Sequence, residues 1–220
     1  MGKTAVIIGN GQFPRKEYPL YILSQADYIV CCDGAFRRYM KHVRDSGSGR
    51  LPDAIVGDMD SLSAADQAKY SHLTVRNPEQ ETNDQTKAFN YVADNFRDVS
   101  DIFFLAATGK REDHTIGNMS LLMEYARERD LDAMGLRIQM VSDYATIFPV
   151  TDSTEIDCGQ GRTVSVFSPD NSLRITSQGL QYPTDNVIFD NWWQATLNRA
   201  VEDTVRLTFS HPSIALIVLD

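Results

Sequence analysis

The chain has 220 residues, of which 42% are hydrophobic and 23% charged, typical of a soluble globular protein large enough for one big domain or two small ones. A net charge of −9 argues against a nucleic-acid or anionic-membrane surface, because both favour a stripe of basic residues. No apolar run approaches the roughly 20 residues of a membrane-spanning helix.

Short apolar runs alternate with helical patterns through the first two thirds of the chain. The runs are continuous, as expected for strands covered on both faces, and such alternation predicts a parallel sheet with right-handed crossovers. The predicted strands are 5–8, 28–32, 54–56, 73–75, 102–106 and 138–141, and the predicted helices lie near 17–25, 35–44, 63–70, 83–97 and 114–129. We expect Thr82 or Asn83 to cap the fourth helix, with Gln85 completing a capping box from Thr82.

After about residue 142 the pattern changes to β-rich segments divided by Gly, Pro, Asn and Asp. These segments are 144–150, 162–167, 172–176, 204–209 and 214–219. They predict a small sandwich or partial barrel. We therefore expect an α/β domain at 1–142, with an open parallel sheet flanked by helices, and an all-β sandwich domain at 143–220. Residues 46–49 are expected to form a short flexible loop.

The cysteines and the N-terminus indicate a cytoplasmic location. Cys31 and Cys32 are adjacent in an apolar run and Cys158 stands alone, so the number and spacing disfavour a disulfide scaffold or a zinc site. Reduced thiols are typical of the cytosol. The first residues also lack a signal-peptide pattern.

Acidic residues follow one predicted strand after another. In an open parallel sheet, ligands bind beyond the carboxyl ends of the strands, so these positions are candidates for a site. They are Asp33, Asp58, Asp60, Asp84 and Asp113.

Asp58 and Asp60 are the sharpest pair. In an extended segment, residues two apart point to the same side, and two carboxylates held together favour a cation between them. Mg²⁺ binds in this way, through one or two carboxylates together with water and phosphate oxygens. The alternative is a polar turn that closes the strand.

Two later segments suggest phosphate binding. Asp84 and Lys87 stand at the start of a helix, where backbone N–H groups face a ligand, although a solvated ion pair explains them as well. Arg111 offers a planar fork for phosphate oxygens, while Asp113 is also consistent with a helix cap and His114 with an ordinary first-turn residue.

Several common motifs are absent. There is no G-x-x-x-x-G-K-[ST], and Pro14 occupies the place of the third glycine after Gly9-Asn10-Gly11, which makes a dinucleotide fingerprint weak. The remaining chemistry is metal-assisted phosphoryl or nucleotidyl transfer.

Four motifs in order resemble those of the thiamine pyrophosphokinase family. They are Asp33-Gly34-Ala35, Gly57-Asp58-x-Asp60-Ser61, Gln80-x-x-x-Asp84-x-x-Lys87-Ala88 and Gly109-x-Arg111-x-Asp113-His114-x-x-x-Asn118. Gly179-Leu180-Gln181-Tyr182 and His211-Pro212 are similar to the family's C-terminal β domain, so the resemblance covers nearly the whole chain.

The resemblance implies transfer of pyrophosphate from ATP to the hydroxyl of thiamine, giving thiamine diphosphate and AMP, in a homodimer with active sites between subunits. It implies a magnesium site at Asp58, Asp60 and Asp84, with Asp33 and Asp113 shaping the catalytic centre. The expected contacts with ATP or its phosphates are Gln80, Lys87, Arg111, His114 and Asn118.

Three positions depart from the family pattern. Asn83 replaces a usual threonine, Lys110 replaces a common second glycine, and the Ser-rich segment on the thiamine side reads Ala195-Thr196-Leu197-Asn198. Because that segment helps form the thiamine side in relatives, the resemblance implies thiamine contacts at Thr196 and Asn198. Trp192 lies just before it and is a further expected contact, since an indole stacks on a flat ring. Sandwich core or dimer contact is the alternative for Trp192 and Trp193.

Other functions remain open at this stage. A diphosphokinase for another hydroxyalkyl heterocycle, such as a pterin, would keep the ATP-side residues. A metal-dependent phosphohydrolase would release phosphate from ATP alone. A non-catalytic nucleotide or thiamine sensor would bind without producing AMP, but it has no need for a costly carboxylate cluster.

Overall fold

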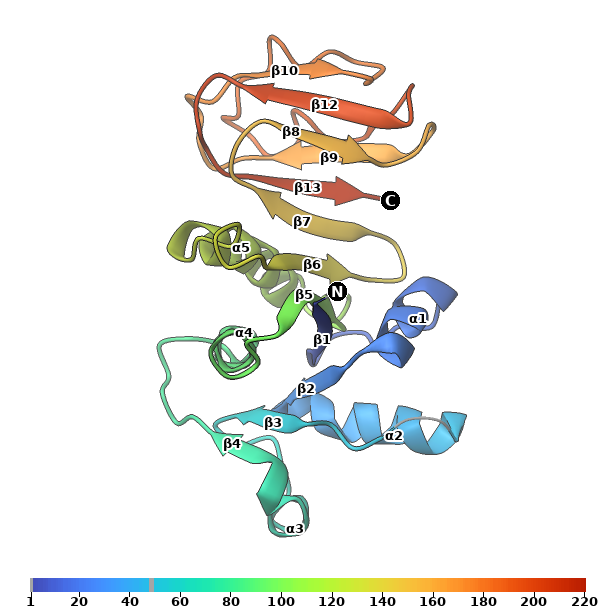
Figure 1. Ribbon diagram of the computed structural model, residues 1–220, viewed down its shortest axis with the longest axis vertical. Helices are drawn as coiled ribbons and strands as arrows, with labels where there is room; N and C mark the ends of the chain where they lie inside the picture. The colour runs from blue at the N-terminus through green and yellow to red at the C-terminus, as the bar shows by residue number, and fades with distance from the viewer. Residues whose placement is uncertain (1, 48–49) are drawn as a thin grey trace. The chain divides into compact units, whose positions relative to one another are not determined.

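The computed structural model describes residues 2–47 and 50–220, and its chain divides into two compact units (Figure 1). The first comprises residues 1–118 and 132–143, and the second 119–131 and 144–220. This division assigns 119–131 to the second unit, whereas the sequence placed one boundary at 142–143. Ser48 and Gly49, part of the expected loop at 46–49, lie outside the described residues.

The first unit contains a parallel sheet in the order β6-β5-β1-β2-β3-β4. The predicted strands are confirmed with small shifts at their ends. Since β1 lies between β2 and β5, the chain reverses its direction of travel across the sheet there, which is where open α/β sheets bind ligands. The strands are β1 (Lys3–Ile8), β2 (Tyr28–Cys32), β3 (Ala54–Gly57), β4 (Thr74–Arg76), β5 (Val99–Leu105) and β6 (Arg137–Val141).

All five predicted helices are present. They are α1 (Glu17–Gln25), α2 (Phe36–Ser46), α3 (Ala64–Lys69), α4 (Asp84–Asn95) and α5 (Glu112–Glu128), with short 3-10 turns η1 (Asp33–Ala35) and η2 (Ser71–Leu73). Helix α4 packs on β1, β2 and β3 through the buried side chains of Ala88, Phe89 and Val92. Within residues 2–47 and 50–220, no helix is long and apolar enough to span a membrane.

The cap of α4 is only partly as predicted. The Asn83 side chain accepts a hydrogen bond from Thr86 N at 2.9 Å, which confirms Asn83 as the cap. The capping box is wrong, because Thr82 N donates to Glu79 Oε1 at 2.8 Å and not to Gln85, whose Nε2 donates to Asn118 O at 3.1 Å. A tertiary partner therefore replaces the expected local one.

The second unit is a β-sandwich, as expected. Its sheets are β11-β9-β13-β7 and β10-β12-β8, each antiparallel. The strands are β7 (Thr146–Val150), β8 (Thr154–Asp157), β9 (Thr163–Phe167), β10 (Ile175–Gln178), β11 (Asn198–Arg199), β12 (Thr204–Phe209) and β13 (Ala215–Leu219). The sequence missed β8, in which Ile156 is the only apolar residue, and β11, which has only two residues.

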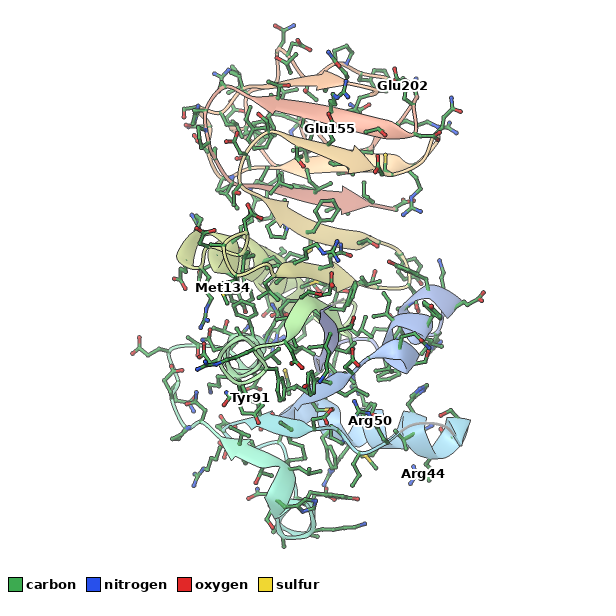
Figure 2. All side chains as sticks on the ribbon, in the orientation of Figure 1. Arg44, Arg50, Tyr91, Met134, Glu155 and Glu202 are labelled. Carbon is green, nitrogen blue, oxygen red and sulfur yellow. The ribbon has the colours of Figure 1, made fainter. Side chains whose placement is uncertain are left out.

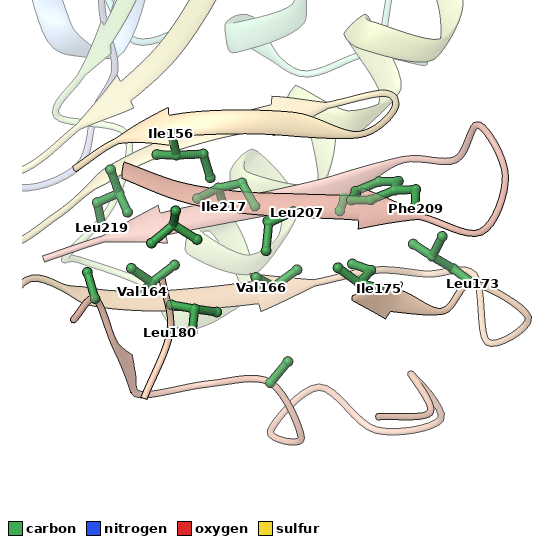
Figure 3. Packing of buried hydrophobic residues seen from close by; sticks show 14 of the residues in the cluster. Ile156, Val164, Val166, Leu173, Ile175, Leu180, Leu207, Phe209, Ile217 and Leu219 are labelled. Carbon is green, nitrogen blue, oxygen red and sulfur yellow. The ribbon is translucent and has the colours of Figure 1, made fainter. Parts of the chain in front are cut away.

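The sandwich core forms from residues that alternate along the strands. On β12, Val205, Leu207 and Phe209 are buried while the residues between them face solvent, as expected for a strand with one covered face. Leu207 lies in the same cluster as Val164 and Ile217 of the other sheet (Figure 3). On the outer side, Glu155 of β8 is labelled in Figure 2. Its Oε1 lies 2.5 Å from Arg206 Nε of β12.

Candidate active site

A cleft of about 340 Å³ opens at the carboxyl ends of β1, β2 and β5. Gly9, Cys32 and Ala107 contribute to it from the ends of these three strands, and the start of α4 closes another side. Its position agrees with the rule that ligands bind where the strand order reverses. The lining residues are Gly9, Asn10, Gly11, Cys32, Ser61, Asn83, Asp84, Gln85, Ala107, Thr108, Lys110, Arg111, His114, Thr115 and Asn118.

The loop after β1 forms one wall because its backbone lies against the segment after β5. Gly11 N donates to Ala106 O at 2.6 Å and Gln12 N to Thr108 O at 2.7 Å. A Cβ atom on Gly11 would lie 2.3 Å from Thr108 O, so only glycine allows this approach. In the sequence this loop resembles only a weak dinucleotide fingerprint, and its role as a wall of the cleft depends on these tertiary contacts.

Asp33 is buried at the end of β2, with 1% of its surface exposed. Its carboxylate accepts hydrogen bonds from Gly34 N and, at 3.4 Å, from Ser61 N. A Cβ atom on Gly57 would lie 2.8 Å from Asp33 Cγ. Gly57 is therefore required by the space that this carboxylate occupies, in addition to any role in turning the chain.

Asp58 and Asp60 share a turn rather than an extended segment. Met59 between them has φ 74°, so the same-side argument from strand geometry was wrong. Asp60 N donates to Asp58 Oδ1 at 3.0 Å and Gln80 Nε2 donates to Asp58 Oδ2 at 3.3 Å. These two bonds, the backbone one first, lower the pKa of Asp58. The turn keeps Asp58 ionised and leaves Asp60 exposed.

Asp84 experiences the opposite influence. Burial, and then the negative charge of Asp33, raise its pKa from 3.8 to about 6, with a smaller contribution from Asp58. Lys87 offsets part of this, since its Nζ lies 3.9 Å from Asp84 Oδ1 and its side chain is only 3% exposed. Burying an ammonium group is costly without a negative partner. Asp33, Asp58, Asp84 and Lys87 thus form one interacting group, which we call the carboxylate cluster.

The carboxylate cluster suits a magnesium ion that a substrate helps to bind. Within residues 2–47 and 50–220, no three His, Cys, Asp or Glu side chains are gathered tightly enough to hold a metal by themselves. Mg²⁺ usually takes one or two carboxylates and completes its shell with water and phosphate oxygens. The raised pKa of Asp84 shows that added positive charge would relieve repulsion here.

Arg111 and Asp113 form an exposed ion pair beside the cleft. Arg111 Nε lies 3.0 Å from Asp113 Oδ1, and Nη2 lies 2.5 Å from Oδ2. This pairing, followed by a bond from His114 N, lowers the pKa of Asp113 to about 2. Asp113 lies inside α5 rather than at its cap, so its main partner is the guanidinium group. Arg111 and His114 both line the cleft.

Asn118 is committed to structural bonds although it lines the cleft. Its Nδ2 donates to Ala107 O at 2.8 Å, and its Oδ1 accepts from Asn83 Nδ2 at 3.0 Å. It therefore joins the end of β5 to the start of α4.

Gln85 also lines the cleft, although the sequence did not indicate it as a site residue. Its Oε1 is a buried atom without a hydrogen-bond partner among the residues described.

The predicted site residues of the first unit therefore divide into three groups. Asp84, Arg111, His114 and Asn118 line the cleft. Asp33, Asp58 and Lys87 interact with Asp84, while Asp60 and Gln80 bind Asp58 and Asp113 binds Arg111. The cleft also has lining residues that were not among the predicted site residues: Gly9, Asn10, Gly11, Cys32, Ser61, Asn83, Gln85, Ala107, Thr108, Lys110 and Thr115.

The expected thiamine contacts lie in the second unit. Trp192 and Trp193 are 54% and 73% exposed, which excludes the sandwich core as their place. The Thr196 hydroxyl donates to Trp193 O at 2.6 Å. The Asn198 amide is occupied by Tyr182, accepting from its N at 3.1 Å and donating to its O at 2.6 Å.

Two family models match the chain, one for each part. "Thiamin pyrophosphokinase, catalytic domain" matches residues 20–134, and "Thiamin pyrophosphokinase, substrate-binding domain" matches 146–214. Thiamine pyrophosphokinase 1 of Oryza sativa subsp. japonica is 29% identical over 233 residues, an alignment that covers 93% of this chain and 83% of the rice protein.

Solved structures show the same fold. Thiamin pyrophosphokinase from Candida albicans superposes with a TM-score of 0.78 at 18% identity, covering 99% of this chain and 88% of that one. Thiamine pyrophosphokinase from Bacillus subtilis gives a TM-score of 0.74 at 18% identity, covering 99% of both chains. Because the catalytic-domain model alone spans more than half of the sequence, the chain belongs to the thiamin pyrophosphokinase family.

Proposed function

We propose that this protein is an enzyme that transfers pyrophosphate from ATP to the hydroxyl of thiamine, giving thiamine diphosphate and AMP. The observation that carries the proposal is the carboxylate cluster beside a cleft that also presents Arg111 and Lys110. Acidic groups for a metal ion and basic groups for phosphate are the two components that such a transfer needs. Family membership supplies the identity of the reaction.

Asp58 and Asp84 are the proposed ligands of Mg²⁺, with Asp60 available from the exposed side of the same turn as Asp58. When bound, the ion supplies positive charge that offsets the charge of both the carboxylates and the polyphosphate. Asp33 is fully buried and bonded to the backbone, so we propose that it holds the cluster together.

The cationic side chains are proposed to bind the phosphates. Lys87 contributes a fixed positive charge inside the cluster. Arg111 exchanges its bonds to Asp113 for phosphate oxygens, and Asp113 orients it in the absence of ligand. His114 and Gln80 are proposed as additional ATP-side contacts. Asn118 is proposed to shape the cleft, because its amide is already bonded.

The transfer itself is a substitution at the β-phosphorus of ATP. The thiamine oxygen forms a bond to this phosphorus while the bond to the oxygen of the α-phosphate breaks, and AMP leaves. A carboxylate of the cluster takes the hydroxyl proton. The fixed cations stabilise charge that spreads over the phosphoryl oxygens in the transition state.

The acceptor side is proposed to include Trp192 and Thr196, since the exposed indole can stack on a flat ring. Asn198 is proposed to hold the Tyr182 segment in place.

A homodimer forms part of the proposal, because the apolar side chains of Trp193 and Leu197 are 73% and 77% exposed and a second subunit would cover them. A cytoplasmic location is proposed because all three cysteines, which lie in the described residues, are free.

The test is AMP release from ATP and magnesium with and without thiamine, with mass detection of the product. We expect AMP and thiamine diphosphate to appear together, only when thiamine is present. Phosphate release without thiamine would indicate a hydrolase, and transfer to a hydroxymethyl pterin alone would indicate another acceptor. Ligand binding without AMP would indicate a sensor. Each of these three results would contradict the proposal.

A further inference from the structure

A second cavity, of about 570 Å³, lies in the first unit outside the carboxylate cluster. Its walls are the loop 11–15 after β1, one face of α2, and the turn at 109–110. The charged and titratable side chains that line it are Arg15, Arg38, Lys41, His42, Asp45 and Lys110. We call this cavity the basic pocket.

The α2 side of the basic pocket follows from helical spacing. Residues 38, 41, 42 and 45 stand at i, i+3, i+4 and i+7, which places them on one face of the helix. This face carries Arg38, Lys41 and His42 against a single acid, Asp45. The sequence therefore concentrates positive charge on the face that borders the cavity.

The charge of the basic pocket opposes that of the whole chain. Four permanent cations, namely Arg15, Arg38, Lys41 and Lys110, face one carboxylate, so the formal sum is +3. Lys41 Nζ forms an ion pair with Asp45 Oδ2, so the excess positive charge comes from the other three. The complete chain carries −9. The net charge of the chain repels a small anion, whereas the excess of cations in the basic pocket attracts it.

Several contacts hold the walls of the basic pocket in place. Arg38 Nη1 donates to Asn10 O at 3.2 Å and also to Gly11 O. The His42 and Phe13 rings lie 5.0 Å apart between centroids. Arg15 N donates to Asp143 Oδ1 at 2.8 Å, which anchors the backbone that carries the Arg15 side chain. A binding site with ordered walls loses less entropy when it takes up a ligand.

The basic pocket borders the catalytic cleft, since Gly11 and Lys110 line both. Arg38 binds the loop that separates the two cavities. Yet the two differ in chemistry, because Asp84 lines the cleft and the carboxylate cluster adjoins it. An anion needs a metal ion beside the carboxylates, whereas the basic pocket offers guanidinium and ammonium groups directly.

We propose that the basic pocket is a second anion site that binds the phosphate groups of a phosphorylated small molecule without a metal ion. The volume falls in the range of small-molecule sites, and guanidinium groups match phosphate geometry. Two sources share this chemistry: the phosphates of the nucleotide substrate, reaching past Gly11, or a separate phosphorylated ligand. The first source rests on the proposed function, whereas the second does not.

The probe is inorganic pyrophosphate in EDTA, titrated calorimetrically into the full-length protein. The double variant Arg15→Gln/Lys41→Gln removes two pocket cations, and the control Arg37→Gln/Lys69→Gln removes the same two residue types from surfaces outside the pocket. Without metal, we expect wild type and control to bind within twofold of each other and the pocket variant to bind at least tenfold more weakly. Circular dichroism and thermal unfolding verify that both variants fold.

The absence of metal-free binding in the wild type would overturn the proposal, as would equal losses in both variants. The KM for ATP in the pocket variant then identifies the source. A rise that parallels the loss of pyrophosphate affinity supports the nucleotide's own phosphates, and an unchanged KM supports a separate ligand. Failure to form thiamine diphosphate would refute the proposed function while leaving the calorimetric result intact.

Discussion

Replacing Asp84 by asparagine should stabilise the metal-free protein while abolishing most of its activity. Asp84 lies among charged groups from several elements: Asp33 on η1, Asp58 after β3, and Lys87 on its own helix. Burial and the two acids together outweigh Lys87, so the pKa of Asp84 rises from 3.8 to about 6. A carboxyl group with a raised pKa binds protons more tightly in the folded state, and ionising it there opposes folding.

The magnitude follows from the difference between the two pKa values. A difference of about 2 pH units corresponds to about 3 kcal/mol. Because the Asp84 side chain is 39% exposed, solvent screening reduces this to about 1–2 kcal/mol. Asparagine resembles the neutral acid, so Asp84→Asn should gain this amount above pH 6. The gain should disappear as the pH falls to about 4, where Asp84 is neutral in the wild type as well.

Urea unfolding in EDTA at pH 8 and pH 4.5 measures the effect, with Asp185→Asn as the control. Asp185 is exposed in the other unit, so its variant should remain within about 0.5 kcal/mol of wild type. If Asp84→Asn were less stable than wild type at pH 8, the cluster would not be under electrostatic strain. Retention of full thiamine diphosphate formation by the same variant would remove Asp84 from the magnesium site.

Three further results are expected. Asp58→Asn should lower kcat/KM at least about 100-fold, and full activity would contradict the metal role. Its free energy of unfolding in urea should stay within about 1 kcal/mol of wild type, because asparagine still accepts the bond from Asp60 N. Arg38→Gln should raise the KM for ATP about 10-fold, because the variant loses two charged bonds to the loop after β1, and Arg38→Lys should recover part of this loss. The control Arg37→Gln should change the KM little, since Arg37 pairs with Asp66 at 3.1 Å instead. Equal KM values for the two Gln variants would show that Arg38 does not position the loop. Leu207→Ala, which truncates a side chain 1% exposed in the sandwich core, should cost about 2–5 kcal/mol in urea unfolding, and a loss below 1 kcal/mol would mean that the core repacks around it.

Much of the fold could be predicted because the relevant signals are local. Continuous apolar runs identified the six strands of the first unit, and helical spacing identified the five helices within a few residues. The predictions failed at β8, where only Ile156 is apolar, and at β11, which has only two residues. They also failed at the Gln85 capping box, where a contact with Asn118 replaced the local one.

The gathering of acidic side chains at one edge of the sheet could be predicted from the sequence, because parallel strands place their carboxyl ends together. The interactions among these side chains depend on tertiary packing. The raised pKa of Asp84 depends on burial and on Asp33, which lies in η1 after β2. The need for glycine at Gly11 depends on the backbone of residues 106–108. The basic pocket likewise combines a helix face that the sequence shows with Arg15 and Lys110, which only folding brings to it. Distances between segments remote in the chain follow from packing, and neither periodicity nor spacing records them.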